Sequence, residues 1–191
     1  MNEQQAITRM KQGDIRGLEV LVHDYQVRAV RTAMMVTQDR AIAEDVVQST
    51  FVRIYHKIHQ FEDGRPFGPW FLRSVVNAAV QEMRKRGRHV SLDAEVPWLD
   101  SDVTFEDLLP AKDIGPDDSI EATELADTIR EALARLSPDQ RAAVVLRYFL
   151  DMSEREMADE LDVPAGTIKW RLHAARKRLR GLLLEQGMEY G

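Results

Sequence analysis

Residues 153–180 have the sequence SEREMADELDVPAGTIKWRLHAARKRLR, in which two helical patterns are separated by a short break. Ser153 and Glu156 have the spacing of a capping box, which starts a helix. Pro164 interrupts the pattern and suits the beginning of a second helix. Each helix has one apolar side at a spacing of about 100° per residue, made by Met157, Ala158 and Leu161 in the first and by Ile168, Leu172, Ala175 and Leu179 in the second. The pattern predicts a helix-turn-helix.

The second helix of this motif is basic. Between positions 164 and 180 there are six lysines and arginines and no acidic residue. Such a helix after a short turn suits the major groove of DNA, because its first residues can reach base edges while later cations contact phosphates. The alternative is a solvated surface helix, and Trp170 could instead pack against another domain. We expect contacts to duplex DNA from Thr167, Lys169, Trp170, Arg171, His173, Arg176, Lys177 and Arg180.

The rest of the chain also has helical spacing of apolar residues and no convincing strand pattern. We expect helices at 3–11, 15–35, 39–59, 69–86, 120–136 and 138–150, with Ser137 as N-cap and Pro138 at the first position of the last of these. A glycine- and proline-rich loop separates the third from the fourth. Residues 91–120 hold nine acidic residues, one lysine and three prolines, which favours an extended linker. The sequence therefore predicts an all-α fold of two small helical domains, 1–90 and 121–191, joined by an acidic, mostly irregular linker.

Composition narrows the function. The 191 residues carry a net charge of −6 at pH 7 and include no cysteine, which excludes disulfides and thiolate zinc sites. His56 and His59 lack a third metal ligand at a fitting spacing, and neither a nucleophile–base pair nor a phosphate-binding loop is present. We therefore expect no enzyme, metal or cofactor. The polar N-terminus and the lack of any apolar run of about 18 residues favour a cytoplasmic chain without membrane insertion.

The N-terminal half offers two further candidate surfaces. In the helix expected at 39–59, one side is apolar and the opposite side carries Asp45, Gln48, Ser49, Val52 and His56. This opposite side is interpreted either as a protein-binding face or as an ordinary solvent-exposed face. The helix expected at 69–86 ends in a basic run close to several aromatic residues. Aromatic rings beside cations suit single-stranded DNA, which needs stacking for its bases and charge for its backbone. Trp70 taken alone fits a core position better.

Three segments carry a resemblance to a known family: RAIAEDVVQSTFVRIY (40–55), the Trp-Phe-Leu stretch from Trp70 through Asn77 to RKRGR (84–88), and residues 136–180. In this order and separation they resemble the extracytoplasmic-function (ECF) sigma factors of bacteria. The resemblance implies a protein that recruits core RNA polymerase to promoters. It places the face with Asp45, Gln48, Ser49, Val52 and His56 on the β′ clamp helices and also implies contact with the β flap.

By the same resemblance, the opened minus-ten element is captured, with one base flipped into a pocket, by Phe61, Gly64, Arg65, Phe67, Trp70, Asn77, Arg84, Lys85, Arg86 and Arg88. The helix-turn-helix is expected to bind the minus-thirty-five element as duplex, and an anti-sigma partner to hold the protein silent. The linker is expected to thread through the polymerase near the RNA exit path. Its apolar residues, which dock on a neighbouring domain or touch a partner, are Trp98, Phe105, Leu108 and Leu109.

Two rival interpretations stay open at this point. One is a stand-alone transcription regulator whose N-terminal half senses a signal or dimerises. The other is an enzyme with a DNA-binding appendage, which would need a concave site with convergent titratable groups. DNA binding without polymerase separates the first rival from a sigma factor. Four residues depart from the usual pattern of the family and bear on the promoter sequence: Pro69, Phe71, Gln81 and Trp170.

Overall fold

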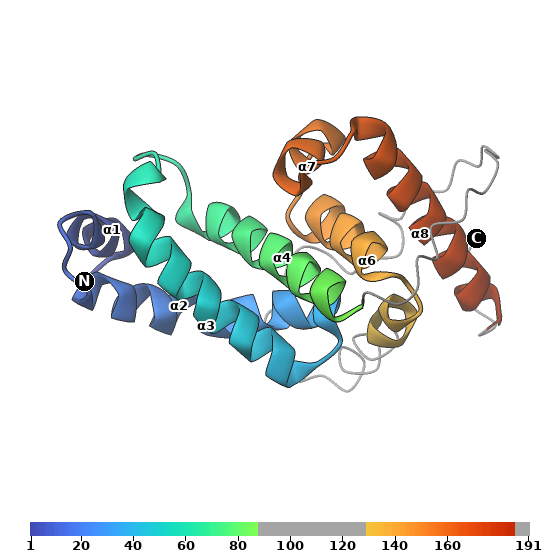
Figure 1. Ribbon diagram of the computed structural model, residues 1–191, viewed down its shortest axis with the longest axis horizontal. Helices are drawn as coiled ribbons and strands as arrows, with labels where there is room; N and C mark the ends of the chain where they lie inside the picture. Colours follow the sequence, from blue (N-terminus) through green and yellow to red (C-terminus); the bar gives the residue numbers. More distant parts are fainter. Residues whose placement is uncertain (88–128, 186–191) are drawn as a thin grey trace. The chain divides into compact units, whose positions relative to one another are not determined.

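The computed structural model describes residues 1–87 and 129–185, with side chains described as far as Gly181. The chain divides into two compact units, Met1–Met83 and Arg84–Gly191. The regular secondary structure of the described residues is helical and includes no strand (Figure 1), which confirms the predicted all-α fold. Arg88, the predicted linker at 91–120 with its apolar residues, and the first part of the helix predicted at 120–136 lie outside the described residues. No helix in the described ranges is both long enough and apolar enough to cross a membrane.

The N-terminal unit consists of helices α1 (Glu3–Lys11), α2 (Arg16–Thr37), α3 (Arg40–Lys57) and all but the last three residues of α4 (Phe67–Arg86), with the 3-10 turn η1 (Ile58–Gln60) after α3. The predicted α1 is confirmed to the residue, and the other boundaries of this unit differ from the prediction by at most two residues, as helix ends commonly do. Local signals explain the boundaries. Asn2 and Gln5 form a capping box at the start of α1. Gln38 ends α2 in the left-handed conformation, and the Asp39 side chain caps α3.

Aromatic side chains fill the centre of this unit. The rings of Phe67 and Phe71 on α4 are stacked at 5.6 Å, and Phe71 lies 4.5 Å from Phe51 on α3. Tyr25 on α2 meets Phe67 edge-on at 5.4 Å. The apolar side predicted for α3 is buried as expected, at Val47, Phe51, Ile54 and Ile58. The core therefore fixes which side of α3 faces outward.

The C-terminal unit contains α6 (Pro138–Val144), a π-helical turn (Val145–Phe149), α7 (Glu154–Leu161) and α8 (Ala165–Glu185). Ser137 caps α6 as predicted, and Gln140 completes a capping box there. The expected continuous helix over 138–150 is interrupted, because the N–H of Leu150 donates to the carbonyl of Val145, five residues back. The extra residue in this turn accompanies the placement of Met152 in the core, where it is fully buried.

The helix-turn-helix prediction is confirmed in its local structure. Ser153 and Glu156 form the capping box at the start of α7, and Asp162 ends that helix in the left-handed conformation. The two predicted apolar sides are buried, at Met157, Ala158, Leu161, Ile168, Leu172, Ala175 and Leu179. Because both helices bury these sides, the opposite side of α8 is the surface that the motif presents.

Candidate nucleic-acid and protein interfaces

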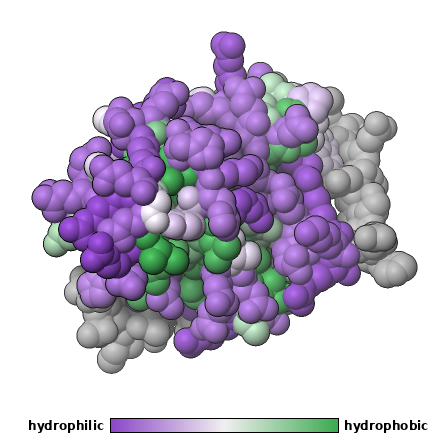
Figure 2. Space-filling view, turned by 60° about the vertical axis from the view of Figure 1, so that its left-hand side comes forward, coloured by the Kyte–Doolittle hydropathy of each residue, from purple (hydrophilic) through white to green (hydrophobic). Residues whose placement is uncertain are grey.

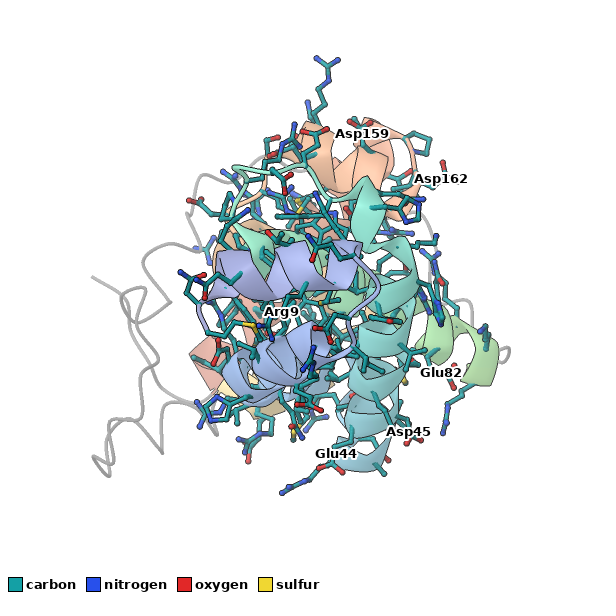
Figure 3. All side chains as sticks on the ribbon, turned by 90° about the vertical axis from the view of Figure 1, so that its left-hand side faces the viewer. Arg9, Glu44, Asp45, Glu82, Asp159 and Asp162 are labelled. Carbon is teal, nitrogen blue, oxygen red and sulfur yellow. The ribbon has the colours of Figure 1, made fainter. Side chains whose placement is uncertain are left out.

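The outward side of α8 is basic, and we call the following exposed and half-buried residues on it the α8 basic face: Lys169, His173, Arg176, Lys177 and Arg180. Thr167 and Trp170 are half-buried beside it. The nearby acidic residues Asp159 and Asp162 belong to α7 and its C-cap (Figure 3). Between Ala165 and Arg180 the helix therefore presents positive charge without an acidic residue, which suits a polyanion.

Arg171 does not belong to this face. Only 7% of the residue is exposed, and its Nη2 lies 3.1 Å from Oδ1 of Asp139 in the first turn of α6. The prediction that Arg171 contacts DNA is therefore corrected: in this fold it ties α8 to α6. The helical spacing contains the signal, because Arg171 follows Ile168 by three positions and so lies only roughly 60° from the core direction at about 100° per residue. Charge alone had suggested the DNA contact.

A second surface is the side of α3 that faces away from the core, which we call the α3 polar face: Asp45, Gln48, Ser49, Val52 and His56, all exposed. Val52 leaves 52% of its surface uncovered, although valine is usually buried. Glu44 and Asp45 point outward near the start of α3 (Figure 3), and the face of the molecule drawn in Figure 2 is mostly hydrophilic with smaller hydrophobic patches. An exposed apolar side chain within a polar rim is the arrangement found at protein interfaces.

The third surface is the loop between η1 and α4. Its interior, from Glu62 to Pro66, is exposed, including the predicted DNA contacts Gly64 and Arg65. Gly64 has a φ of +88°, which favours glycine. Phe61 and Phe67 at its two ends are 3% and 0% exposed, so neither can stack on a base in this conformation. Their predicted role as DNA contacts is corrected: they anchor the loop in the core, and the sequence could not separate this role from base stacking.

Trp70 closes the aromatic cluster under the loop. Its ring lies 4.9 Å from Phe61 and 5.7 Å from Phe67, and it is half-buried, so one part packs in the core while another part stays uncovered. Further along α4, half-buried Asn77 accepts a hydrogen bond from Gln81 at 3.1 Å. The last turn of α4 carries three exposed cations, Arg84, Lys85 and Arg86. Polar and basic side chains thus follow one another along α4 from the loop to its end.

Two contacts near this loop had no signal in the sequence. Lys11, at the end of α1, donates from Nζ at 2.8 Å to the carbonyl oxygen of Phe61, which lies fifty positions further along the chain. The hydroxyl of Tyr25 donates to the carboxylate of Glu3, and burial together with this bond raises the pKa of Tyr25 to about 12. Both contacts fix α1 against the elements that hold the loop.

Comparison with known proteins assigns both halves of the chain. Residues 21–89 match the family model described as "Sigma-70 region 2", and residues 126–179 match "Sigma-70, region 4". The ECF RNA polymerase sigma factor SigW of Bacillus subtilis is 30% identical over 91% of this chain and 92% of its own length. The RNA polymerase sigma-H factor of Pseudomonas aeruginosa is 30% identical over 96% of each chain.

Solved structures agree on the fold. The sigma factor RpoE of Bartonella quintana, in complex with the anti-sigma factor NepR, is 28% identical with a TM-score of 0.56, covering 86% of this chain and 95% of that one. CnrH, in complex with the cytosolic domain of CnrY, is 22% identical with the same TM-score and supports the fold alone. Together with the helix-turn-helix and the two-unit helical fold, these matches show that the chain belongs to the ECF family of RNA polymerase sigma factors, which direct the polymerase to promoters.

Proposed function

We propose that this sigma factor docks on the β′ clamp helices of core RNA polymerase through the α3 polar face. The observation that carries the proposal is the division of α3 into a fully buried apolar side and an exposed side with Asp45, Gln48 and the uncovered Val52. The matched region 2 includes all of α3. An exposed valine among an acid and an amide offers the partner both apolar area and directional hydrogen bonds.

We further propose that the α8 basic face binds the minus-thirty-five element as duplex. Lys169 lies early in the helix, where side chains can reach base edges, and Lys177 and Arg180 follow where phosphates are met. Half-buried Trp170 offers an apolar edge beside Lys169, suited to a thymine methyl group. Residues 121–191 then form the minus-thirty-five domain, which also contacts the β flap, and residues 91–120 connect it to the N-terminal domain, 1–90.

The opened minus-ten element is proposed to bind along the loop and α4. Gly64 and Arg65 present backbone and charge from the exposed loop, the uncovered part of Trp70 offers a stacking surface, and Asn77 with the cations of the last turn continues the path. Phe61 and Phe67 are excluded from this surface because they are buried.

An anti-sigma factor is proposed to restrain the protein. The support is the structure of the similar RpoE, solved in complex with the anti-sigma factor NepR. Because it is proposed to bind RNA polymerase, the protein is also proposed to act in the cytoplasm without membrane insertion. The same binding makes it an initiation factor rather than an enzyme.

The docking proposal is tested by recovering core polymerase with the tagged full chain. Asp45→Ala combined with Gln48→Ala should abolish recovery and run-off transcription. Arg40→Ala combined with Glu44→Ala removes an exposed ion pair of α3 outside the proposed face and should leave both unchanged. Normal recovery with the first pair would refute the docking face.

A second measurement separates a sigma factor from a stand-alone regulator. The isolated chain should bind promoter duplex poorly and should bind strongly with core polymerase. Lys169→Ala should weaken promoter use by the holoenzyme. Tight, sequence-specific binding by the chain alone would contradict a sigma factor that needs core polymerase to hold the promoter, and would favour the stand-alone regulator.

A further inference from the structure

The last residue of α1 makes three contacts with the loop that is proposed to capture the minus-ten strand. The Lys11 ammonium donates to the carbonyl oxygen of Phe61 at 2.8 Å and to Oδ1 of Asp63 at 2.7 Å. It also lies 5.9 Å from the centre of the Phe61 ring, within the range of a cation–π contact. One side chain therefore holds the buried beginning of the loop and its exposed interior at once.

These contacts differ from an isolated surface ion pair. The Lys11 side chain is only 25% exposed, whereas that of Asp63 is 65% exposed. An exposed pair alone contributes little, because water and salt screen it. Here the same ammonium also satisfies a part-buried backbone carbonyl, and such charge-assisted bonds are the stronger and more directional ones. The position of Lys11 is thus transmitted to the loop backbone and not only to an exposed carboxylate.

The other contacts within the loop are local to it. Arg65 pairs with Glu62 at 2.8 Å, and both side chains are about two-thirds exposed. Gly64, at a φ of +88°, gives the chain its turn between them. Local pairs of this kind keep the loop compact. The buried rings of Phe61 and Phe67 anchor its two ends in the core, and the tie from Lys11 adds a contact from α1 to Asp63 in its exposed part.

Helix α1 is itself firmly seated. Ile7 and Met10 are buried, and Glu3 accepts the hydrogen bond from Tyr25 at the other end of the helix. The hydroxyl of Tyr55, at the end of α3, donates to the carbonyl of Gly13 just after α1 at 3.0 Å. The Lys11 backbone is therefore fixed on both sides, and its ammonium can hold the loop at a defined position relative to α1. This helix precedes residues 21–89, the part that matches the region 2 family model.

We propose that Lys11 is a positioning residue for promoter opening: it holds residues 61–65 in the orientation in which Gly64 and Arg65 receive the unpaired minus-ten strand. The inference rests on the proposed function of the loop. Lys11 does not need to touch DNA. Its loss frees the loop and uncovers the Asp63 carboxylate near the path of the phosphates.

The experiment uses holoenzyme reconstituted with the full chain and a promoter obtained by start-site mapping of run-off transcripts. Permanganate reactivity of thymines in the minus-ten region measures opening. Lys11→Met should slow opening about tenfold, as expected for the loss of one charge-assisted contact, and should reduce discrimination against substituted non-template bases. Polymerase recovery should stay normal. Lys11→Arg should retain most of the rate, because it keeps the charge and donors.

Two matched variants separate positioning from charge and from folding. Arg9→Met removes an exposed cation from the same helix and should open the promoter at the normal rate. Lys11→Met combined with Asp63→Asn removes the uncovered carboxylate without restoring the tie, and opening should stay slow. Amide exchange of residues 61–65 should rise in Lys11→Met while α3 keeps its protection, which verifies a folded domain.

The outcomes distinguish the inference from the function on which it rests. Opening at the normal rate by Lys11→Met, or full recovery in the double variant, would overturn the positioning role. Arg65→Ala tests the loop itself. Normal opening and normal base discrimination by Arg65→Ala would instead refute the assignment of the loop to the minus-ten strand.

Discussion

The buried pair between Arg171 and Asp139 gives a test in which structural and DNA-binding roles predict opposite results. Arg171→Met keeps most of the aliphatic stem and removes the guanidinium, whose Nη2 lies 3.1 Å from the Asp139 carboxylate. The side chains of the pair are 8% and 18% exposed, so the charge left on Asp139 is only partly solvated. The substitution should therefore act on the stability of the C-terminal unit.

The magnitude follows from the environment of the remaining charge. Removing one partner of a buried ion pair costs about 3–5 kcal/mol. Asp139 keeps a second partner, because the Arg84 guanidinium also donates to its carboxylate. It retains some access to water and lies in the first turn of α6, where the helix dipole favours a negative charge. These effects reduce the penalty, and we expect a loss of about 1–2 kcal/mol in the free energy of unfolding of this unit.

Amide hydrogen exchange of the full chain measures this loss with an internal control. Protected amides of α6, α7 and α8 should exchange about 5- to 30-fold faster in Arg171→Met, while those of α1 to α3 should not change. Lys169→Met, at an exposed position of α8, should leave exchange unchanged and weaken promoter use. Unchanged exchange in Arg171→Met, together with the promoter defect of Lys169→Met, would refute the structural role and return Arg171 to the DNA interface.

Two further predictions concern the helix contacts. A Cβ at Gly17 would lie 2.3 Å from the carbonyl oxygen of Ala6. Gly17→Ala should therefore lower the melting temperature through a loss of about 1–3 kcal/mol in the free energy of unfolding. Gly181→Ala is the control: the space around Gly181 on α8 is open, so this change should be neutral or stabilising by up to about 1 kcal/mol. The pKa of Tyr25 is raised to about 12 from an ordinary value near 10, so the folded state binds its proton more tightly; the resulting stability is complete below pH 10 and is lost as the pH rises through 12. Urea unfolding at pH 9 and pH 11 should show a larger drop for the native chain than for Tyr25→Phe, and equal drops would contradict this account.

The sequence was sufficient for the features that depend on neighbouring residues. The buried sides of α3 and α8 follow from apolar residues at helical spacing, and the starts of α6 and α7 follow from Ser137 and Ser153 as capping residues. These signals are local: a side chain bonds a backbone group three positions away, or recurs on one side of a helix. For the same reason the paired motifs allowed the family to be identified before any tertiary contact was known.

Only the tertiary structure decided which charged and aromatic residues are available to a partner. Arg171 is buried against Asp139, and Phe61 and Phe67 anchor a loop whose outer part stays exposed. The π-helical turn and the tie from Lys11 to Phe61 had no sequence signal either. The physical reason is that burial and long-range hydrogen bonds depend on what packs against a residue, while its type and spacing are the same in a core and in an interface. The basic second helix of the motif at 153–180 therefore keeps its outward side but presents a smaller set of cations, because Arg171 is buried.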